Sequence, residues 1–331
     1  MNTNNNRDTK KRSRHGAIIA AACAIIAIGC GVMVMNPLKN RMEPTETPAA
    51  ESSVVTTQEE SSREDSSEEE IMIEDSTPQK RDIQPWAVDL LERNEDTVGW
   101  IKIPGITDDN GEEYINFPVL QGEDNEYYLY KNIDEEYYES GSIYADAWST
   151  IDEYGQSDNL TIFGHHMGVL GTSFTHLSEY KKGAEFLREH PTIEFNTIYE
   201  NDARYAIVSC FMINTQPEED NGNLFEYIGY RDFDDDEYKF DTWYNEISKR
   251  SWYTNDIKCT ENDKYITLST CSKLLNNDDL RWVIVAKKLT PEDDLDHIIA
   301  SYQDKDDKDI YFPQFWIDRY GNKTVDEGWA L

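Results

Sequence analysis

Basic residues are scarce in this chain of 331 residues: 31 lysines and arginines stand against 66 aspartates and glutamates, a formal net charge of −35. A surface this negative repels a phosphate backbone, which argues against a nucleic-acid partner. Cysteine is also rare. The five cysteines form no CxxC pair and no Cys/His cluster with zinc-ligand spacing, and no glycine-rich phosphate loop is present. The sequence therefore predicts no metal, nucleotide or other cofactor.

Long apolar runs are missing as well, with one exception near the N-terminus. Residues Ala17 to Met35 carry no charge, and the basic residues that precede them are Arg7, Lys10, Lys11, Arg12 and Arg14. As a helix this run is long enough to cross a hydrocarbon core of ~30 Å, and its basic flank stays in the cytoplasm. A cleaved signal peptide is the alternative, but no clear A-x-A pattern follows the run. We expect a cytoplasmic segment at 1–15 and a retained membrane anchor at 16–35.

Apolar side chains are again lacking in residues 36–82, which are rich in Glu, Ser, Thr, Pro and Asp. Low hydrophobicity with high charge predicts a disordered, acidic spacer that lifts an extracellular domain, residues 83–331, off the membrane. Cys210, Cys259 and Cys271 lie in that domain. Because their number is odd, at least one thiol of an extracellular domain stays free. The sequence leaves open whether Cys210 and Cys259 pair.

Short runs of branched and aromatic residues, separated by Gly, Asp, Asn and Pro turns, fill the domain. The predicted strands are residues 98–104, 116–120, 141–145, 160–163, 192–196, 204–212, 265–271 and 281–287. Strands at such intervals predict a mostly β domain, either a barrel or a sandwich.

Helices are predicted at fewer places. Trp86, Leu90 and Leu91 recur at helical spacing, which predicts an N-terminal helix that packs on the core. Aromatic residues at similar spacing predict a helix within the long connection from Ile213 to Lys258. We also expect short helical turns at 174–180 and 183–189, a surface helix after residue 291, and an aromatic tail at 311–316 that packs back on the barrel.

Three chemically active side chains fall at ends of predicted strands. Cys271 ends one strand, His165 follows Gly164 at the end of another, and Arg281 begins the strand after the cysteine. Strand ends hold side chains rigidly while opening into loops, where catalytic groups collect. Each residue also has an ordinary interpretation: a buried apolar cysteine, a surface histidine and a charge at a barrel rim.

The chemistry of these residue types fits acyl transfer. A cysteine thiol has a pKa of about 8.5 and needs nearby positive charge to populate its thiolate at neutral pH. Histidine titrates close enough to neutrality to give a proton to a leaving amine. Arginine stays charged and can hold a carbonyl or an oxyanion.

The motifs that carry these residues resemble those of the sortases, cysteine transpeptidases of Gram-positive cell surfaces. They are Thr161-Ile-Phe-Gly-His-His-Met167, Thr267-Leu-Ser-Thr-Cys271 and Arg281-Trp-Val-Ile-Val285, placed after an anchor and a spacer. Within the family, three further stretches resemble class B: Val98-Gly-Trp-Ile-Lys-Ile-Pro104, Asn116-Phe-Pro-Val-Leu-Gln121 and Asp124-Asn-Glu-Tyr-Tyr-Leu129. The resemblance covers residues 83–289. It implies a closed sortase-type β-barrel of about eight strands, with an N-terminal helix and a helix in the long loop before the cysteine strand.

The resemblance also assigns roles. His165 rather than the adjacent His166, together with Cys271 and Arg281, matches the catalytic positions of the family. The substrate-binding positions match Asn125, Leu129, Ser269, Tyr227 and Ile228. The implied reaction cleaves a C-terminal sorting motif after threonine in a secreted protein, through a thioester, and passes the protein to an amine of a peptidoglycan precursor.

Other readings stay open. A pilin-polymerising sortase would use a lysine as the acceptor. A papain-like protease also uses cysteine and histidine, but there the cysteine opens the domain in a helix and precedes the histidine, whereas here His165 comes before Cys271. A non-catalytic surface barrel predicts no thiol reactivity at all.

Overall fold

The computed structural model describes residues 79–167, 172–234, 236, 238–271 and 279–325. Backbone contacts divide the chain into two units, Met1–Met72 and Ile73–Leu331, and all of these residues belong to the second. The expected cytoplasmic segment, membrane anchor and most of the spacer therefore lie outside the described residues. No helix among the described residues is long and apolar enough to cross a membrane.

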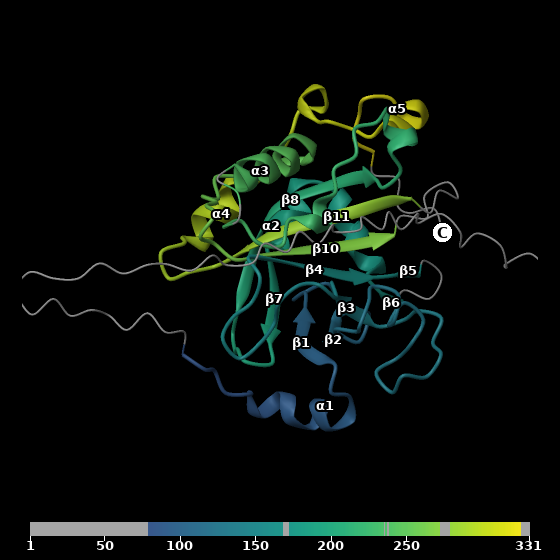
Figure 1. Ribbon diagram of the computed structural model, residues 1–331. Helices are drawn as coiled ribbons and strands as arrows, with labels where there is room; N and C mark the ends of the chain where they lie inside the picture. The colour runs from purple at the N-terminus through teal and green to yellow at the C-terminus, as the bar shows by residue number, and fades with distance from the viewer. Residues whose placement is uncertain (1–78, 168–171, 235, 237, 272–278, 326–331) are drawn as a thin grey trace, which may run out of the picture. The chain divides into compact units, whose positions relative to one another are not determined.

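Eight strands close into a barrel, which confirms the predicted fold class (Figure 1). Around the barrel they are β1 (Thr97–Lys102), β2 (Asn116–Leu120), β3 (Ile143–Ala145), β4 (Asn159–Gly164), β10 (Tyr265–Cys271), β11 (Leu280–Lys288), β8 (Arg204–Asn214) and β7 (Thr192–Thr197), and β7 pairs back with β1. Each predicted strand forms, with ends that differ from prediction by two residues at most. Apolar side chains such as Ile162, Leu268 and Ile284 fill the buried faces.

The directions of the central strands decide where functional groups emerge. β4 and β10 are parallel, with Tyr265 opposite Asn159 and Thr270 opposite Gly164. β11 runs antiparallel to β10 and pairs Arg281 with Cys271. The C-terminal ends of β4 and β10 and the start of β11 therefore lie at one end of the barrel, which we call the groove end. The start of β4, the start of β10 and the end of β11 lie at the other, the base.

Helical segments cover parts of the barrel surface (Figure 1). They are η1 (Pro85–Ala87), α1 (Val88–Arg93), η3 (Thr175–Lys181), α2 (Ala184–Glu189), η4 (Pro217–Asp220), η5 (Tyr227–Gly229), α3 (Lys239–Arg250), α4 (Leu295–Ser301), η7 (Asp307–Asp309) and α5 (Gln314–Tyr320). Short strand pairs join β5 (His166–Met167) to β6 (Thr172–Ser173) and β9 (Tyr253–Thr254) to β12 (Gln303–Asp304).

The predicted N-terminal helix forms, but it packs less deeply than expected. No residue of α1 is buried, and Leu90 and Leu91 are only half-buried, so the helix lies on the surface of the domain. The predicted helix of the long connection is α3, which buries Phe240, Trp243 and Ile247. Phe233 precedes it and is buried against Trp243 at a ring-centroid distance of 5.0 Å.

The aromatic tail packs back as predicted. The Trp316 ring lies 5.5 Å from the ring of Trp252, which in turn contacts Trp282 of β11 at 4.9 Å. All three rings are almost fully buried. Aromatic side chains bury large areas and prefer such edge-on contacts, so the tail forms part of the domain core.

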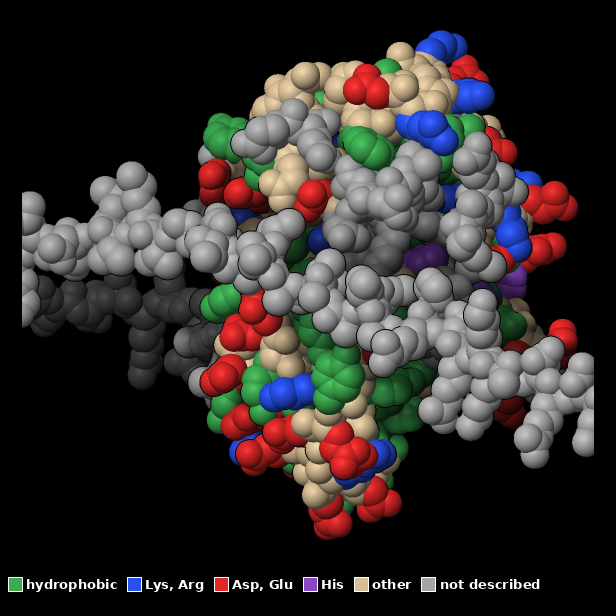
Figure 2. Space-filling model, turned by 90° about the vertical axis from the view of Figure 1, so that its right-hand side faces the viewer, with side chains coloured by type: hydrophobic (Ala, Val, Ile, Leu, Met, Phe, Trp, Pro, Cys, Tyr) green, Lys and Arg blue, Asp and Glu red, His purple; other side chains and the backbone are tan. Residues whose placement is uncertain are grey.

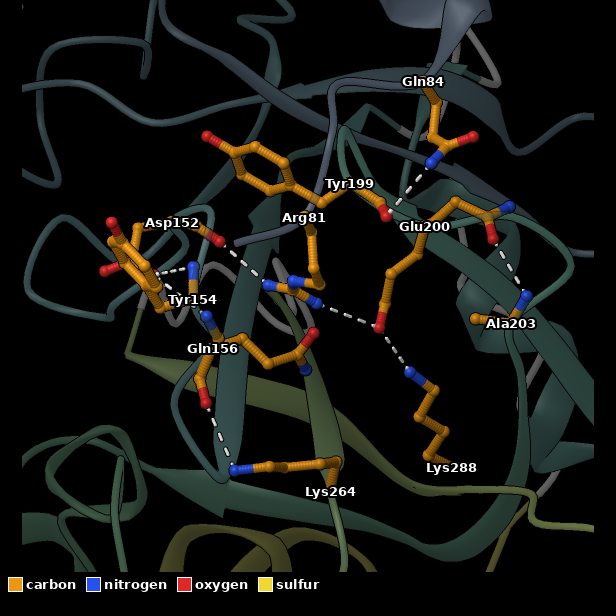
Figure 3. A network of polar contacts seen from close by, with 12 residues as sticks. Arg81, Gln84, Asp152, Tyr154, Gln156, Tyr199, Glu200, Ala203, Lys264 and Lys288 are labelled. Carbon is orange, nitrogen blue, oxygen red and sulfur yellow. Dashed lines mark hydrogen bonds and ion pairs between the residues drawn. The ribbon is translucent and has the colours of Figure 1, made fainter. Parts of the chain in front are cut away.

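Ion pairs fasten the N-terminal segment to the base of the barrel (Figure 3). The Arg81 guanidinium donates to the backbone carbonyl of Asp152 at 2.8 Å and lies 3.3 Å from a carboxylate oxygen of Glu200. Lys288 at the end of β11 binds the same oxygen at 2.8 Å. Glu200 therefore joins the start of the domain to the last residue of a barrel strand.

Candidate functional site

A cavity of about 250 Å³ opens at the groove end of the barrel. Its lining is Asn125, Leu129, Tyr144, Phe163, Gly164, His165, Thr215, Tyr227, Ile228, Ser269 and Arg281. Seven of the eight site residues predicted from sequence are in this set. The eighth is Cys271, whose backbone ends β10 and whose side chain lies outside the described part of the molecule.

The register of β4 and β10 places the backbones of His165 and Cys271 next to each other. Thr270 is the partner of Gly164, so His165 and Cys271 are each the next residue along two parallel strands. Neighbouring strands lie about 4.8 Å apart. On the other side of β10, Cys271 is the direct partner of Arg281. The three residues thus leave adjacent strands at one edge of the sheet.

Gly164 is required here by packing. A Cβ atom at this position would lie 2.6 Å from Cδ1 of Ile143 and 2.7 Å from Cγ of Phe174. The backbone of His165 then accepts a hydrogen bond from the amide of Phe174 at 2.9 Å. The glycine that suggested a close turn from sequence therefore lets β4 approach its neighbours and fixes the point at which His165 departs.

The His165 ring is oriented by two contacts from one loop. Its Nε2 lies 2.8 Å from the carbonyl oxygen of Leu129, and its ring stacks on Tyr130 at 5.4 Å between centroids. Because a carbonyl oxygen only accepts, Nε2 is the nitrogen that carries the proton. The sequence assigned Leu129 to substrate binding; its backbone also orients the histidine. Tyr130, half exposed, gave no sequence signal.

His166, the alternative histidine, is placed differently. It lies in β5, is only 6% exposed, and is not among the described residues that line the cavity. This arrangement favours His165 for the catalytic role.

Ser269 and Tyr227 form a buried pair in the cavity. The Tyr227 hydroxyl and Ser269 Oγ are 2.8 Å apart, and both residues are no more than 3% exposed. Ser269 lies two residues before Cys271 on β10, while Tyr227 belongs to η5 in the long connection. The hydrogen bond therefore attaches the wall formed by the connection to the strand that carries the cysteine.

Asn125 lies on the opposite wall, and its amide is held in place. Nδ2 donates to Asp146 Oδ1 at 2.8 Å, and Oδ1 accepts from the amide of Ala147 at 2.8 Å. Asp146 is fully buried and also binds Arg231. Sequence reasoning singled out neither Asp146 nor Arg231, since a single aspartate after a strand carries no signal.

Two cysteines have described side chains, Cys210 and Cys259, and neither lines the cavity. Cys210 and Cys259 are both free thiols, so the pairing left open by the sequence does not occur. Burial raises the pKa of Cys210 well above its ordinary value and that of Cys259 to about 12. A thiol with a raised pKa is protonated and unreactive at neutral pH.

The cavity thus contains a histidine and an arginine beside the strand end that carries a cysteine, a set suited to acyl transfer. Among the described residues, no three His, Cys, Asp or Glu side chains gather as metal ligands. Figure 2 looks onto the groove end, where histidine side chains are visible with acidic side chains around the edge of the face.

Comparison with known proteins gives a consistent result. Residues 101–289 match the family model described as the sortase domain. The chain is 31% identical to sortase B of Staphylococcus aureus over 205 residues, 62% of this chain and 75% of that protein. It is also 31% identical to sortase B of Listeria monocytogenes over 202 residues, 61% of this chain and 73% of that protein.

Solved structures resemble the fold as well. The Staphylococcus aureus sortase B–substrate complex superimposes with a TM-score of 0.53 at 29% identity, covering 63% of this chain and 87% of that one. A Clostridium perfringens sortase B gives a TM-score of 0.50 at 25% identity, covering 61% of this chain and 99% of that one.

Proposed function

The chain belongs to the sortase family, is similar to its class B members, and is a cysteine transpeptidase; from that premise we propose which residues act and on what. Cys271 is the nucleophile, His165 the proton donor and Arg281 the residue that stabilises negative charge. The observation that supports this assignment is the cavity, whose lining contains His165, Arg281 and Ser269. Ser269 lies on β10, two residues before Cys271.

The first half-reaction makes a thioester. The Cys271 thiolate attacks the carbonyl carbon after threonine in a C-terminal sorting motif, and the tetrahedral oxyanion forms within reach of the Arg281 guanidinium. The C–N bond then breaks, and the leaving amine takes its proton from His165. Asn125, Leu129, Ser269, Tyr227 and Ile228 bind the motif along the cavity.

The second half-reaction resolves the thioester. An amine attacks the thioester carbonyl and gives its proton to His165, the C–S bond breaks, and the thiolate is regenerated with a new amide as product. The acceptor is the amine of a peptidoglycan precursor. A pilin lysine would undergo the same chemistry, and the experiment below distinguishes the two acceptors.

The location of the enzyme follows from the N-terminal sequence. We propose a cytoplasmic segment at 1–15, a membrane anchor at 16–35, an acidic spacer at 36–82 and an extracellular catalytic domain at 83–331. An apolar run without charges and the basic residues before it support this topology. Such a location places the groove among secreted proteins and wall precursors.

Mass spectrometry of the protein mixed with a library of threonine-containing sorting peptides tests the proposal. We expect one class of peptides to add an acyl fragment to Cys271, with release of the C-terminal remainder. Addition of glycine-based or diaminopimelate-based amines then discharges the adduct if wall precursor is the acceptor, whereas a lysine-containing pilin peptide discharges it in the alternative. An intact, folded protein that forms no adduct at Cys271 would contradict the proposed function.

A further inference from the structure

The cavity has two walls from distant parts of the sequence. Asn125 and Leu129 line one, and Tyr227 and Ile228 of η5 line the other. Neither wall is part of a barrel strand, although the second is hydrogen-bonded to two of them, through Tyr227 to Ser269 of β10 and through the backbone carbonyl of Arg231 to the amide of Asn159 in β4. A direct contact between the two walls would in addition fix their separation, which matters if the groove is to bind one peptide in one orientation.

A single carboxylate contacts both walls. Asp146 directly follows β3 and its side chain is fully buried. Its Oδ1 accepts from Nδ2 of Asn125 at 2.8 Å on the first wall. On the second, Arg231 lies two residues after η5 and donates from Nε to Oδ2 at 2.5 Å and from Nη2 to Oδ1 at 3.2 Å.

Charge and geometry make this contact specific. A buried carboxylate is costly unless a cation and hydrogen bonds compensate it, and Arg231 supplies both in a two-pronged arrangement. Lysine has a single ammonium and cannot reproduce the fork. The Trp148 ring lies 5.7 Å from the guanidinium carbon, which adds a cation–π contact on Arg231.

The same carboxylate decides which way the Asn125 amide points. The nitrogen has to face Asp146 and the oxygen has to face the amide of Ala147, so the flipped amide would lose both bonds. One N–H of Asn125 then remains for a ligand in the cavity. Asp146 therefore fixes both the position of this wall and the hydrogen-bonding group that it offers.

We propose that Asp146 and Arg231 are positioning residues that hold the two groove walls together and orient Asn125 for the sorting peptide. The inference rests on the proposed function of the cavity. According to this inference, the Asp146–Arg231 ion pair controls peptide binding although neither residue takes part in the reaction. The reactivity of the Cys271 thiol does not depend on the pair.

The test compares Arg231→Lys with a matched control in the full-length protein. Arg93→Lys alters another two-pronged arginine–aspartate pair, with Asp134 at 2.6 and 2.5 Å, on the exposed surface of α1. The substrate is the peptide found to acylate Cys271. We expect Arg231→Lys to lower kcat/KM at least tenfold, mainly by raising KM, and Arg93→Lys to stay within twofold of wild type. Alkylation of Cys271 by iodoacetamide should stay within twofold in both variants.

The outcomes separate the possibilities. If Arg231→Lys keeps the wild-type kcat/KM, the inference is wrong and the proposed function is unaffected. The inference is also wrong if alkylation of Cys271 slows as much as peptide acylation in this variant, because the substitution then disrupts the site in general. Absence of any peptide adduct on wild type would overturn the proposed function and the inference with it. If Arg231→Lys does not accumulate as folded protein, Asp146→Asn carries the same prediction, because its single acceptor oxygen cannot serve both positions at which Asn125 and Arg231 now donate.

Discussion

The two ends of the barrel are built from opposite ends of the same strands, and they differ in what their polar side chains do. At the base, Lys264 binds Asp158 at 2.6 Å and Lys288 binds Glu200 at 2.8 Å. At the groove end, His165 and Arg281 line a cavity instead. The charged side chains at the base form ion pairs that stabilise the fold. His165 and Arg281 at the groove end are half-buried and line a cavity that a peptide can enter.

The strand directions explain how one barrel provides both a stabilised base and a cavity at the groove end. β4 and β10 are parallel, so the residues that precede both strands meet at the base and those that follow both meet at the groove end. Because ion pairs at the base stabilise the barrel, the polar residues at the groove end are not needed to hold the fold together. Substitutions at the two ends should therefore separate activity from stability.

The largest effect is expected at Cys271. Cys271→Ala removes the proposed nucleophile, so acylation by the sorting peptide should fall by at least about 10⁴-fold. Initial rates of adduct formation by mass spectrometry measure it. Cys259→Ala is the control, because its thiol has a pKa of about 12 and takes no part. Peptide mapping after iodoacetamide at neutral pH should find Cys271 modified faster than Cys210 or Cys259; equal labelling of the three would count against the assignment.

The next effect separates two adjacent histidines. His165→Ala should lower kcat about 10²- to 10⁴-fold, because it removes the proposed proton donor to the leaving amine. His166→Ala should keep kcat within about tenfold, since His166 lies outside the cavity lining. Steady-state kinetics with the identified peptide measure both. A His166→Ala enzyme that is the more impaired of the two would reverse the assignment.

Arg281→Lys tests the charge beside the cysteine strand. Lysine keeps the charge but lacks the planar fork, so we expect kcat/KM to fall about 10²-fold, mostly through kcat if the guanidinium stabilises the oxyanion. A fall confined to KM would show that Arg281 binds the motif in the ground state instead.

A smaller effect is expected from the Tyr227–Ser269 pair. Tyr227→Phe removes the hydroxyl and leaves buried Ser269 Oγ without this partner, a cost of ~1 kcal/mol or about fivefold in KM for the peptide. Ser269→Ala in the same background should add little, because the two groups share one bond. Additive losses from the two substitutions would mean that each contacts the substrate separately.

The smallest effect on activity is expected at the base. Glu200→Gln weakens the pairs with Arg81 and Lys288, and should lower the free energy of unfolding by ~1–3 kcal/mol. The value of kcat/KM should stay within twofold of wild type, because Glu200 lies at the far end of the strands. Thermal unfolding and peptide kinetics on the same sample measure both. If Glu200→Gln lowers kcat/KM without lowering the free energy of unfolding, the base is not a purely structural end of the barrel and the comparison is wrong.

Local pattern in the sequence was sufficient for the strands and for finding the side chains at their ends that we propose as reacting groups. Short runs of branched and aromatic residues mark the barrel strands, and a strand end is recognisable from the chain alone, which is how Cys271 and His165 were found. Family motifs supplied Asn125, Leu129, Ser269, Tyr227 and Ile228, and the structure gathers all five in one cavity. The burial of α1 was overestimated, because helical spacing shows an apolar face without showing what covers it.

The sequence by itself determined which residues form strands and which chemical groups stand at their ends, since both depend on neighbours along the chain. The tertiary structure alone decided how the groove is held. Asp146 and Arg231 are 85 residues apart, and the Leu129 carbonyl reaches His165 across 36 residues. Hydrogen bonds between such distant residues depend on how the barrel closes, and no local pattern in the chain encodes that closure.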